Sequence, residues 1–389
     1  MNIVQLQAFV VRVPLKRAVK HASHVRKFTD NVIVRCELAD GSVGWGEGVP
    51  REYVTGESAE TAFDLLEATD WKAVLHPASH FAEALTWIEA LTLPQAADDD
   101  RRCRGNAARC AVELALLDAF GRSFGEPLMK AVTLLAPELA EPKAEVRYSG
   151  IVLSAKGWKA RLASLGQRLY GLKQLKVKVG ITGQDDAKRL SIIRRFAGKA
   201  MELRVDANEA WSAAACVERI RALEPFDIAC VEQPVPHEQV ADLAAIRKDV
   251  STPIMLDESL CSMVDAERAV AEATCDLFNL RLSKCGGFLP TLRLAQFARR
   301  HHLGYQLGCQ VGETGILSAA GRHFACMVSG IRALEGSFDR RLVADACTLE
   351  DLTFGRGGLA PMLPGCGLGV TVVAERIASM VTRRAVIHE

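Results

Sequence analysis

The sequence has no uninterrupted apolar run that approaches the ~20 residues a bilayer-spanning helix needs. It has no C-x-x-C pair among its 12 cysteines, although this spacing is typical of zinc sites and thiol redox sites. Net charge is nearly absent, because 48 lysines and arginines stand against 47 aspartates and glutamates. These absences argue against membrane and nucleic-acid partners, and they favour an enzyme that acts on a small molecule.

The first residues, MNIVQLQAFVVRVPLKR, lack the basic start, apolar core and cleavage site of an export signal, and they read as a strand. Scattered cysteines in such a chain are typical of buried thiols in a reducing compartment. We therefore expect a cytoplasmic protein, and we expect it to assemble as a homo-oligomer.

The first third of the chain mixes strands and helices. A strand is predicted at residues 3–13, and residues 31–37 and 42–47 predict a hairpin about Asp40-Gly41, a favoured two-residue turn. Helices are predicted at residues 57–69, 81–91 and 106–123. We assign residues 1–130 to an α+β domain, and we expect the glycine-rich tail, residues 355–389, to return to it.

From about residue 145 a short apolar strand followed by an amphipathic helix recurs along the chain. The predicted strands cover residues 146–152, 174–179, 202–206, 228–232, 253–257, 277–284, 304–309 and 333–338. The predicted helices cover residues 185–196, 213–223, 240–248, 265–273, 291–301 and 317–328. Alternating strands and helices pair in parallel, and eight strands close a TIM barrel. We predict an α/β barrel over residues 131–354, with an open doubly wound sheet as the alternative.

Charged residues stand where five of these apolar strands end: Lys178, Asp206, Glu232, Asp257 and Lys284. Their successive separations of 28, 26, 25 and 27 residues each match about one strand-helix unit. In a barrel all five side chains would meet at the carboxyl-terminal mouth, where barrel enzymes place their catalytic residues.

Three carboxylates that converge at this depth would repel one another without a cation. Asp206, Glu232 and Asp257 therefore predict a site for Mg²⁺, a hard ion that binds carboxylates together with water and substrate oxygens. Mn²⁺ fits the same oxygen ligands. The alternative is that each acid caps the helix that follows its strand.

The two lysines would enter this site from opposite sides. Lys178 and Lys284 would act on a proton, because burial and a nearby cation lower the pKa of lysine from its usual value of about 10.4. Lys176 lies on the same strand face as Lys178. It would contact a substrate oxygen or lower the pKa of Lys178 through its like charge. The alternative is that these lysines are solvated surface cations.

Five short motifs carry a resemblance to a known family: Lys176-Val-Lys178, Asp206-Ala-Asn208, Glu232-Gln-Pro234, Asp257-Glu-Ser259 and Lys284-Cys-Gly-Gly287. In order and spacing they resemble the enolase superfamily, specifically its muconate-lactonising (muconate cycloisomerase) subgroup. The resemblance extends to Gly46-Glu-Gly48 in the amino-terminal domain. It implies a (β/α)7β barrel with an α+β capping domain over its mouth.

The resemblance also implies roles for individual residues. Asp206, Glu232 and Asp257 would bind magnesium, and Lys178 and Lys284 would serve as base and acid on opposite faces of the reacting carbon. An enolate formed next to a substrate carboxylate is the expected intermediate. The absence of histidine at the end of strand seven argues against the mandelate-racemase subgroup and its histidine base.

Further substrate contacts are expected from Lys176, from Asn208, and from Tyr53 in a segment that looks like the family's substrate-covering loop. Glu335 resembles the strand-eight glutamate of cycloisomerases, although it would alternatively pair with Arg332. Residues 20–24 are a second candidate lid, in which we assign no catalytic role to His21 or His24.

Within this subgroup, cycloisomerisation of muconate is our favoured reaction for a small-molecule carboxylate substrate. Epimerisation of an amino-acid derivative or dipeptide, or elimination as in a dehydratase or o-succinylbenzoate synthase, remains an alternative. Dipeptide epimerases carry Asp-x-Asp on strand eight, whereas this chain has Glu335-Gly-Ser-Phe-Asp339. A Schiff-base aldolase and a non-catalytic binding protein are the alternatives from other classes.

Overall fold

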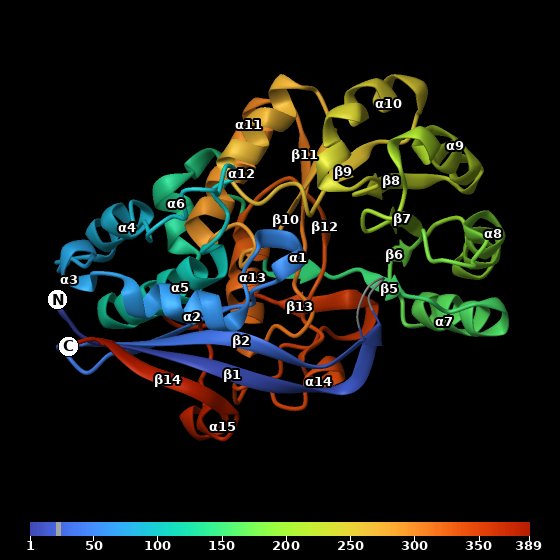
Figure 1. The fold of residues 1–389 in the computed structure, drawn as a ribbon. Helices are drawn as coiled ribbons and strands as arrows, with labels where there is room; N and C mark the ends of the chain where they lie inside the picture. The colour runs from blue at the N-terminus through green and yellow to red at the C-terminus, as the bar shows by residue number, and fades with distance from the viewer. Residues whose placement is uncertain (21–24) are drawn as a thin grey trace.

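The computed structural model describes residues 1–20 and 25–389 (Figure 1), so His21 and His24 of the candidate lid lie outside the described residues. The amino-terminal part consists of β1 (Ile3–Lys20), β2 (Val25–Leu38), β3 (Val43–Gly48), α1 (Glu52–Thr55), α2 (Ala59–Ala68), α3 (Trp71–Val74), α4 (Phe81–Glu89), α5 (Asn106–Phe124) and α6 (Lys130–Leu135). The predicted helices at 57–69, 81–91 and 106–123 are confirmed as α2, α4 and α5, with ends that shift by one or two residues.

The amino-terminal sheet has the antiparallel order β14-β1-β2-β3, in which β14 (Val381–His388) comes from the far end of the chain. Figure 1 shows the red β14 beside the blue β1. The predicted hairpin of β2 and β3 is confirmed, but its turn is longer than two residues. Leu38 N–H donates to the Ser42 carbonyl (2.9 Å), which leaves a three-residue loop that ends on Gly41 at φ 82°. Only glycine adopts that conformation without strain.

Alternate glycines on β3 allow α5 to pack directly against the sheet. A Cβ atom on Gly44, Gly46 or Gly48 would lie 2.2, 2.0 or 1.9 Å from a backbone atom of α5. Since successive strand residues face opposite sides, the intervening Glu47 points away from α5. Its carboxylate is fully buried and reaches the helix that precedes the last barrel strand.

The second part of the chain is a barrel of eight parallel strands: β5 (Gly150–Val152), β6 (Gln174–Lys178), β7 (Glu202–Asp206), β8 (Ile228–Glu232), β9 (Ile254–Leu256), β10 (Leu277–Leu280), β11 (Gly304–Leu307) and β12 (Ile331–Leu334). Neighbours in the sheet are neighbours in the sequence, which rules out the doubly wound alternative. The ring is completed where Ser149 N–H donates to the Leu334 carbonyl (2.8 Å). The (β/α)7β architecture is thereby confirmed.

Seven helices connect these strands: α7 (Gly157–Leu169), α8 (Asp186–Ala197), α9 (Ala213–Leu223), α10 (Leu243–Asp249), α11 (Met263–Ala271), α12 (Phe288–Arg300) and α13 (Gly315–Met327). Short elements complete the chain: η1 (Pro137–Leu139), η2 (Glu224–Phe226), η3 (His237–Asp242), α14 (Asp339–Leu342), η4 (Arg356–Gly358) and α15 (Ala374–Ala378). The predicted helix at 240–248 starts as η3 and continues as α10.

Three strand predictions need correction. The strand predicted at 333–338 is β12, which covers residues 331–334, so Glu335 follows the strand rather than lying on it. The single strand predicted at 146–152 is two strands, because β4 (Glu145–Arg147) pairs with β13 (Leu359–Pro361) outside the barrel. The strand predicted at 277–284 ends at Leu280, so Lys284 lies in the turn that follows rather than on the strand. Gly286 and Gly287 in this turn have positive φ angles of 89° and 127°, which an extended strand cannot contain.

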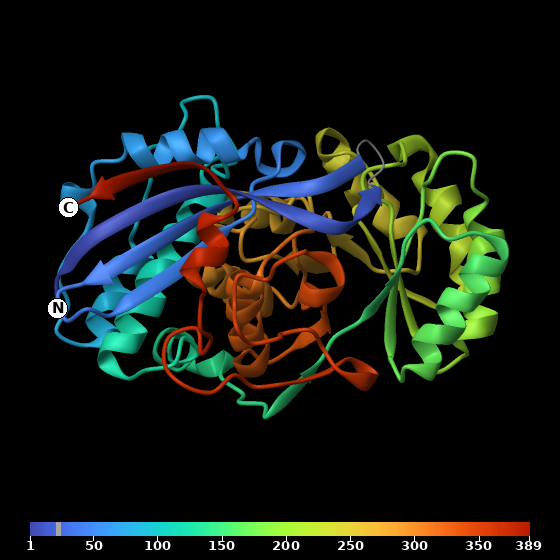
Figure 2. The same cartoon turned by 90° about the horizontal axis from the view of Figure 1, so that it is seen from below.

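The amino-terminal domain reaches over the barrel. Figure 2 shows the long β1–β2 hairpin crossing towards the green barrel strands. Ala344 N–H donates to the Pro14 carbonyl (2.8 Å), and Lys16 Nζ donates to the Arg340 carbonyl (2.6 Å), which ties the hairpin to the loop after β12. All 12 cysteines are unpaired, and all but Cys309 and Cys366 are buried. In the described part of the chain, no helix combines the length and apolarity that a membrane span requires.

Candidate active site

The strand register brings the predicted site residues to one end of the barrel. Lys178 pairs with Asp206 across β6 and β7, and Asp206 pairs with Glu232 across β7 and β8. Glu232 in turn pairs with Met255 on β9, two residues before Asp257. The three carboxylates are fully buried. The prediction that they end consecutive strands therefore agrees with the register.

A cation lies between each neighbouring pair of these carboxylates. Lys176 Nζ is 3.3 Å from Asp206 and 3.2 Å from Glu232. The Arg281 guanidinium contacts both Glu232 (3.5 Å) and Asp257. Arg281 was not among the predicted residues, because an arginine just beyond a strand end gives no signal of which acids it will meet.

The two candidate catalytic lysines lie on opposite flanks of the carboxylates. Lys178 Nζ is 2.7 Å from Asp206 Oδ2 and also contacts the Asn208 side chain. Lys284 Nζ is 2.9 Å from Asp257 Oδ1 and donates to the Asn279 carbonyl (2.8 Å). Lys284 is almost completely buried, whereas Lys178 is partly accessible.

Burial and neighbouring charges both shift the pKa values of these groups. Burial raises the pKa of Asp206, but Lys178 and Lys176 outweigh it and hold that pKa well below its usual range. Burial and the charge of Asp206 raise the pKa of Glu232 to about 7. For Lys284 burial lowers the pKa, yet Asp257 reverses the balance and raises it.

Asp206, Glu232 and Asp257 are the candidate ligands for the divalent ion that the family motifs imply. Within residues 1–20 and 25–389, no three Asp, Glu, His or Cys side chains are gathered closely enough to hold an ion. The donor chemistry nevertheless fits, because three buried carboxylates already share cationic partners pairwise. Binding an ion would require Lys176 and Arg281 to release these shared contacts. Carboxylate oxygens are the ligands that Mg²⁺ prefers.

A cavity of about 320 Å³ opens beside these groups. Its lining includes the predicted substrate-binding residues Tyr53, Lys176, Asn208 and Glu335 together with Lys178. Apolar side chains cover much of the rest: Ile151, Leu153, Val311, Phe338 and Leu342. The three carboxylates and Lys284 lie behind the cavity wall and are not part of its lining.

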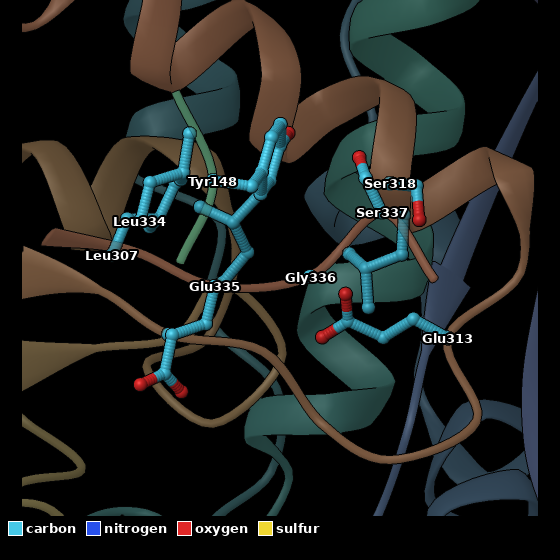
Figure 3. Close-up of a pocket in the computed structure, with 12 residues that line it drawn as sticks. Tyr148, Leu307, Glu313, Ser318, Leu334, Glu335, Gly336 and Ser337 are labelled. Carbon is cyan, nitrogen blue, oxygen red and sulfur yellow. The ribbon is translucent and has the colours of Figure 1, made fainter. Parts of the chain in front are cut away.

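Glu335 pairs with Lys176 and Arg204 rather than with Arg332, the partner considered from the sequence. Its Oε2 accepts from Lys176 Nζ (2.7 Å) and its Oε1 accepts from Arg204 Nη1 (3.0 Å), whereas Arg332 is not its partner. In Figure 3 its side chain points away from Ser318 and Ser337, which line the same small void. Glu258 is a further lining residue without a predicted role, and it accepts from Asn208 Nδ2 (3.0 Å).

Comparison with known proteins identifies the family. Residues 4–132 match the family "Mandelate racemase / muconate lactonizing enzyme, N-terminal domain", and residues 160–376 match "Enolase C-terminal domain-like". The chain belongs to the enolase superfamily. This confirms the resemblance that the sequence motifs carry to the enolase superfamily and to its muconate-lactonising subgroup.

Curated relatives of this superfamily member are isomerases. A D-Ala-D/L-Ala epimerase of Cytophaga hutchinsonii is 31% identical over 79% of this chain and 79% of its own length. An N-succinyl-L-Arg/Lys racemase of Bacillus cereus is 27% identical over 98% of both chains. Muconate cycloisomerase 1 of Rhodococcus opacus is 28% identical over 97% of this chain and 98% of its own. The prediction of an isomerase is confirmed.

Among solved structures, a dipeptide epimerase from Cytophaga hutchinsonii, complexed with Mg and the dipeptide D-Ala-L-Val, superposes with a TM-score of 0.84. It is 26% identical, and the match covers 100% of both chains. The relatives support the racemase or epimerase alternative better than the cycloisomerase reaction that we favoured from the sequence.

Proposed function

We propose that the protein is a metal-dependent racemase or epimerase that inverts the α-carbon of an amino-acid derivative or dipeptide. The observation that carries this proposal is the placement of two lysines on opposite flanks of three buried carboxylates. Lys178 is anchored to Asp206 at one side, and Lys284 is anchored to Asp257 at the other. Inversion needs a base on one face of a carbon and an acid on the other.

In this proposal Asp206, Glu232 and Asp257 hold Mg²⁺, with Mn²⁺ as a possible replacement. When bound, the ion would neutralise negative charge that builds on the substrate carboxylate as the α-proton leaves. Nζ of one lysine takes the α-proton, and Nζ of the other returns a proton to the opposite face. Lys176 and Arg281, which line the cavity, would release their shared contacts with the acids and supply positive charge near the substrate carboxylate.

The two lysines make a specific exchange pattern testable. Each enantiomer of a substrate points its α-proton at one lysine only. Lys178→Ala and Lys284→Ala should therefore each abolish inversion, while the remaining lysine still exchanges the α-proton of one enantiomer with deuterium. Proton NMR in heavy water with Mg²⁺, applied separately to both enantiomers of N-acylamino acids and to dipeptides, measures this.

A matched control is Lys188→Ala, which removes an exposed lysine on α8 and should leave inversion unchanged. If Lys178→Ala inverted substrate at the wild-type rate, the two-base assignment would be wrong. If the wild-type protein exchanged no α-proton in any of these compounds, the racemase or epimerase function itself would be wrong.

Muconate cycloisomerisation is the second candidate. It is supported by Glu335, which resembles the strand-eight glutamate of cycloisomerases, and by the similarity to the Rhodococcus opacus enzyme. Incubation with cis,cis-muconate and detection of a lactone separates the two candidates, because an epimerase forms no lactone. The domain division at residues 130 and 354, the homo-oligomeric assembly and the cytoplasmic location stay predictions of the sequence.

A further inference from the structure

The turn that carries Lys284 lies outside the barrel sheet. β10 ends at Leu280, four residues earlier, so strand pairing does not fix the position of this lysine. The next residues include Gly286 and Gly287, whose positive φ angles turn the backbone sharply. Lys178 differs, because it is the last residue of β6 and pairs directly with β7. The backbone of Lys284 therefore has to be held by contacts of another kind.

Helix α5 of the capping domain supplies such contacts. Asn106 Nδ2, at the start of α5, donates to the carbonyl oxygen of the lysine itself (2.6 Å). Arg109 Nη1, one turn later, donates to the Gly286 carbonyl (2.6 Å). The Glu113 carboxylate, one turn further, accepts from Leu289 N–H at the start of α12 (2.8 Å). Residues three and four apart share one face of a helix, so these three side chains form a single polar edge of α5 that faces the turn.

The turn and the polar edge of α5 fit closely together. A Cβ atom on Gly287 would lie 2.6 Å from the Glu113 carboxylate, and one on Gly286 would lie 3.0 Å from Asn106 Oδ1. Arg109 and Glu113 also form an ion pair, and the Glu113 side chain is completely buried. A pair taken out of water is costly unless its remaining hydrogen bonds are made. Backbone groups of the turn and of α12 make two of them.

Asn106 also connects Lys284 to the loop of its carboxylate partner. The same Nδ2 donates to the Cys261 carbonyl (2.8 Å), in the loop that follows β9. That loop carries Asp257, whose Oδ1 accepts from Lys284 Nζ (2.9 Å). One amide of the capping domain therefore holds both the backbone of the lysine and the loop that binds its ammonium group.

Lys178 is held from within the barrel instead. Its strand β6 pairs with β5 on one side and with β7 on the other. Arg189, a buried residue of α8, donates to the Lys178 carbonyl. The turn of Lys284 has a further contact with the capping domain, because Val49 N–H donates to Ser283 Oγ (2.7 Å). The two lysines thus depend on different parts of the molecule.

We propose that Asn106, Arg109 and Glu113 position Lys284, so that the capping domain controls proton transfer on one face of the substrate α-carbon. This inference rests on the proposed function. The three are positioning residues, because they contact the backbone of the turn and of α12. None of them is among the described residues that line the 320 Å³ cavity.

The consequence of losing these contacts is one-sided. Without the Asn106 amide, the turn backbone is free to shift, and Lys284 Nζ moves with it. Proton transfer depends steeply on such shifts, because a displacement of about 1 Å can lower the rate about 100-fold. Lys178 keeps its strand pairing and its contact with Arg189, so proton transfer on the other face is retained.

Separate measurement of the two substrate enantiomers tests this inference. In Asn106→Ala, α-proton exchange should fall at least tenfold for the enantiomer that Lys284→Ala fails to exchange, and less than about threefold for the other. The loss should appear in kcat, with KM within about threefold of the wild type, because no substrate contact is removed. Proton NMR in heavy water with saturating Mg²⁺ measures this on both enantiomers or epimers of the N-acylamino acid or dipeptide that the wild type exchanges fastest.

A second variant and a rescue come from Glu113. Glu113→Ala removes the acceptor of Leu289 N–H and should cause the same one-sided loss. Glu113→Gln keeps an oxygen at this position and should stay within about threefold of the wild-type rate for both enantiomers. Circular dichroism checks folding, and either Asn106→Ala or Glu113→Ala alone suffices for the test.

Glu89→Gln is the matched control. It removes an ion pair between α4 of the capping domain and Arg293 on α12, and it leaves the contacts of the Lys284 turn in place. The ratio of the exchange rates of the two enantiomers should therefore equal that of the wild type.

The failures of the two proposals are distinguishable. Unchanged exchange, or an equal loss for both enantiomers, in folded Asn106→Ala or Glu113→Ala would overturn the positioning role and leave the racemase or epimerase function standing. Absence of α-proton exchange by the wild-type protein in all of these compounds would overturn the function, and the positioning role with it.

Discussion

Glu47 joins the two parts of the molecule, and its removal has a calculable effect. The residue lies on β3 of the capping domain, yet its carboxylate accepts from Thr314 N–H and Leu317 N–H at the start of α13 in the barrel. Glu47→Ala leaves these two buried donors unsatisfied, at about 1–3 kcal/mol each. We expect a loss of roughly 3–5 kcal/mol in the free energy of unfolding, including the lost helix cap.

The same carboxylate predicts a dependence of stability on pH. Burial raises the pKa of Glu47 from 4.5 to about 7, against hydrogen bonds that lower it. A group with a raised pKa in the folded state favours folding most while it is protonated in both states, and this contribution is lost as pH rises through 7. The shift predicts a loss of about 2–3 kcal/mol between pH 5 and pH 8. Glu47→Gln cannot titrate, so the stability of the wild type relative to this variant should fall by the same amount over this interval.

Equilibrium urea unfolding followed by tryptophan fluorescence at pH 5, 6.5 and 8 measures both effects. Glu218→Gln, on the exposed face of α9, is the control and should stay within about 0.5 kcal/mol of the wild type. A cost of less than about 1 kcal/mol for Glu47→Ala, the lower bound for one unsatisfied buried donor, would contradict this role of Glu47. An equal difference in stability between wild type and Glu47→Gln at pH 5 and pH 8 would contradict the raised pKa.

Three further outcomes are expected. Gly46→Ala should destabilise the capping domain by several kcal/mol, because its Cβ would lie 2.0 Å from the Ala111 carbonyl oxygen; thermal unfolding checks this, and an unchanged midpoint would contradict it. Asp206→Asn should weaken Mg²⁺ binding at least tenfold by calorimetry, whereas Lys284→Ala should leave most of it intact. Removal of divalent ions with a chelator should stop α-proton exchange, and added Mg²⁺ should restore it; exchange that persists would exclude a metal-dependent reaction.

The sequence predicts the barrel well where each strand is a short apolar run closed by an acid. The predicted strands at 202–206 and 228–232 coincide with β7 and β8, where Leu203, Val205, Ile228 and Val231 are buried apolar residues. The prediction extends too far at 277–284, because Leu282 and Cys285 are also buried, although they lie in a turn. Burial alone does not distinguish a strand from a tightly packed turn.

The acids of the site are predictable from their spacing, but the cations that lie between them are not. Arg281 meets Glu232 and Asp257, and Arg204 meets Glu335, only after the barrel has closed. Their partners stand on strands far away in the sequence, and no periodic pattern links them. The positions of Glu313 and Asp339 in the cavity lining are not predictable for the same reason, because one precedes α13 and the other begins α14.

The preference for cycloisomerisation depended on the end of strand eight, where Glu335 stands and the Asp-x-Asp pair of dipeptide epimerases is missing. Glu335 resembles a cycloisomerase glutamate in sequence, but its two oxygens are occupied by Lys176 and Arg204, an arrangement that stabilises the barrel floor whatever the reaction. The choice of reaction depends on the groups that hold the rest of the substrate. Those groups lie in loops, where a single sequence gives little information about direction.

The pairing of β1 with β14 joins segments from opposite ends of the described chain. During synthesis β1 and β2 can form a hairpin early, but the other edge of β1 has no partner until the ribosome has produced β14. An open strand edge is a template for unwanted association. The nascent chain is therefore exposed to aggregation through this edge for most of its translation. Mutations that truncate β14 would prolong that exposure.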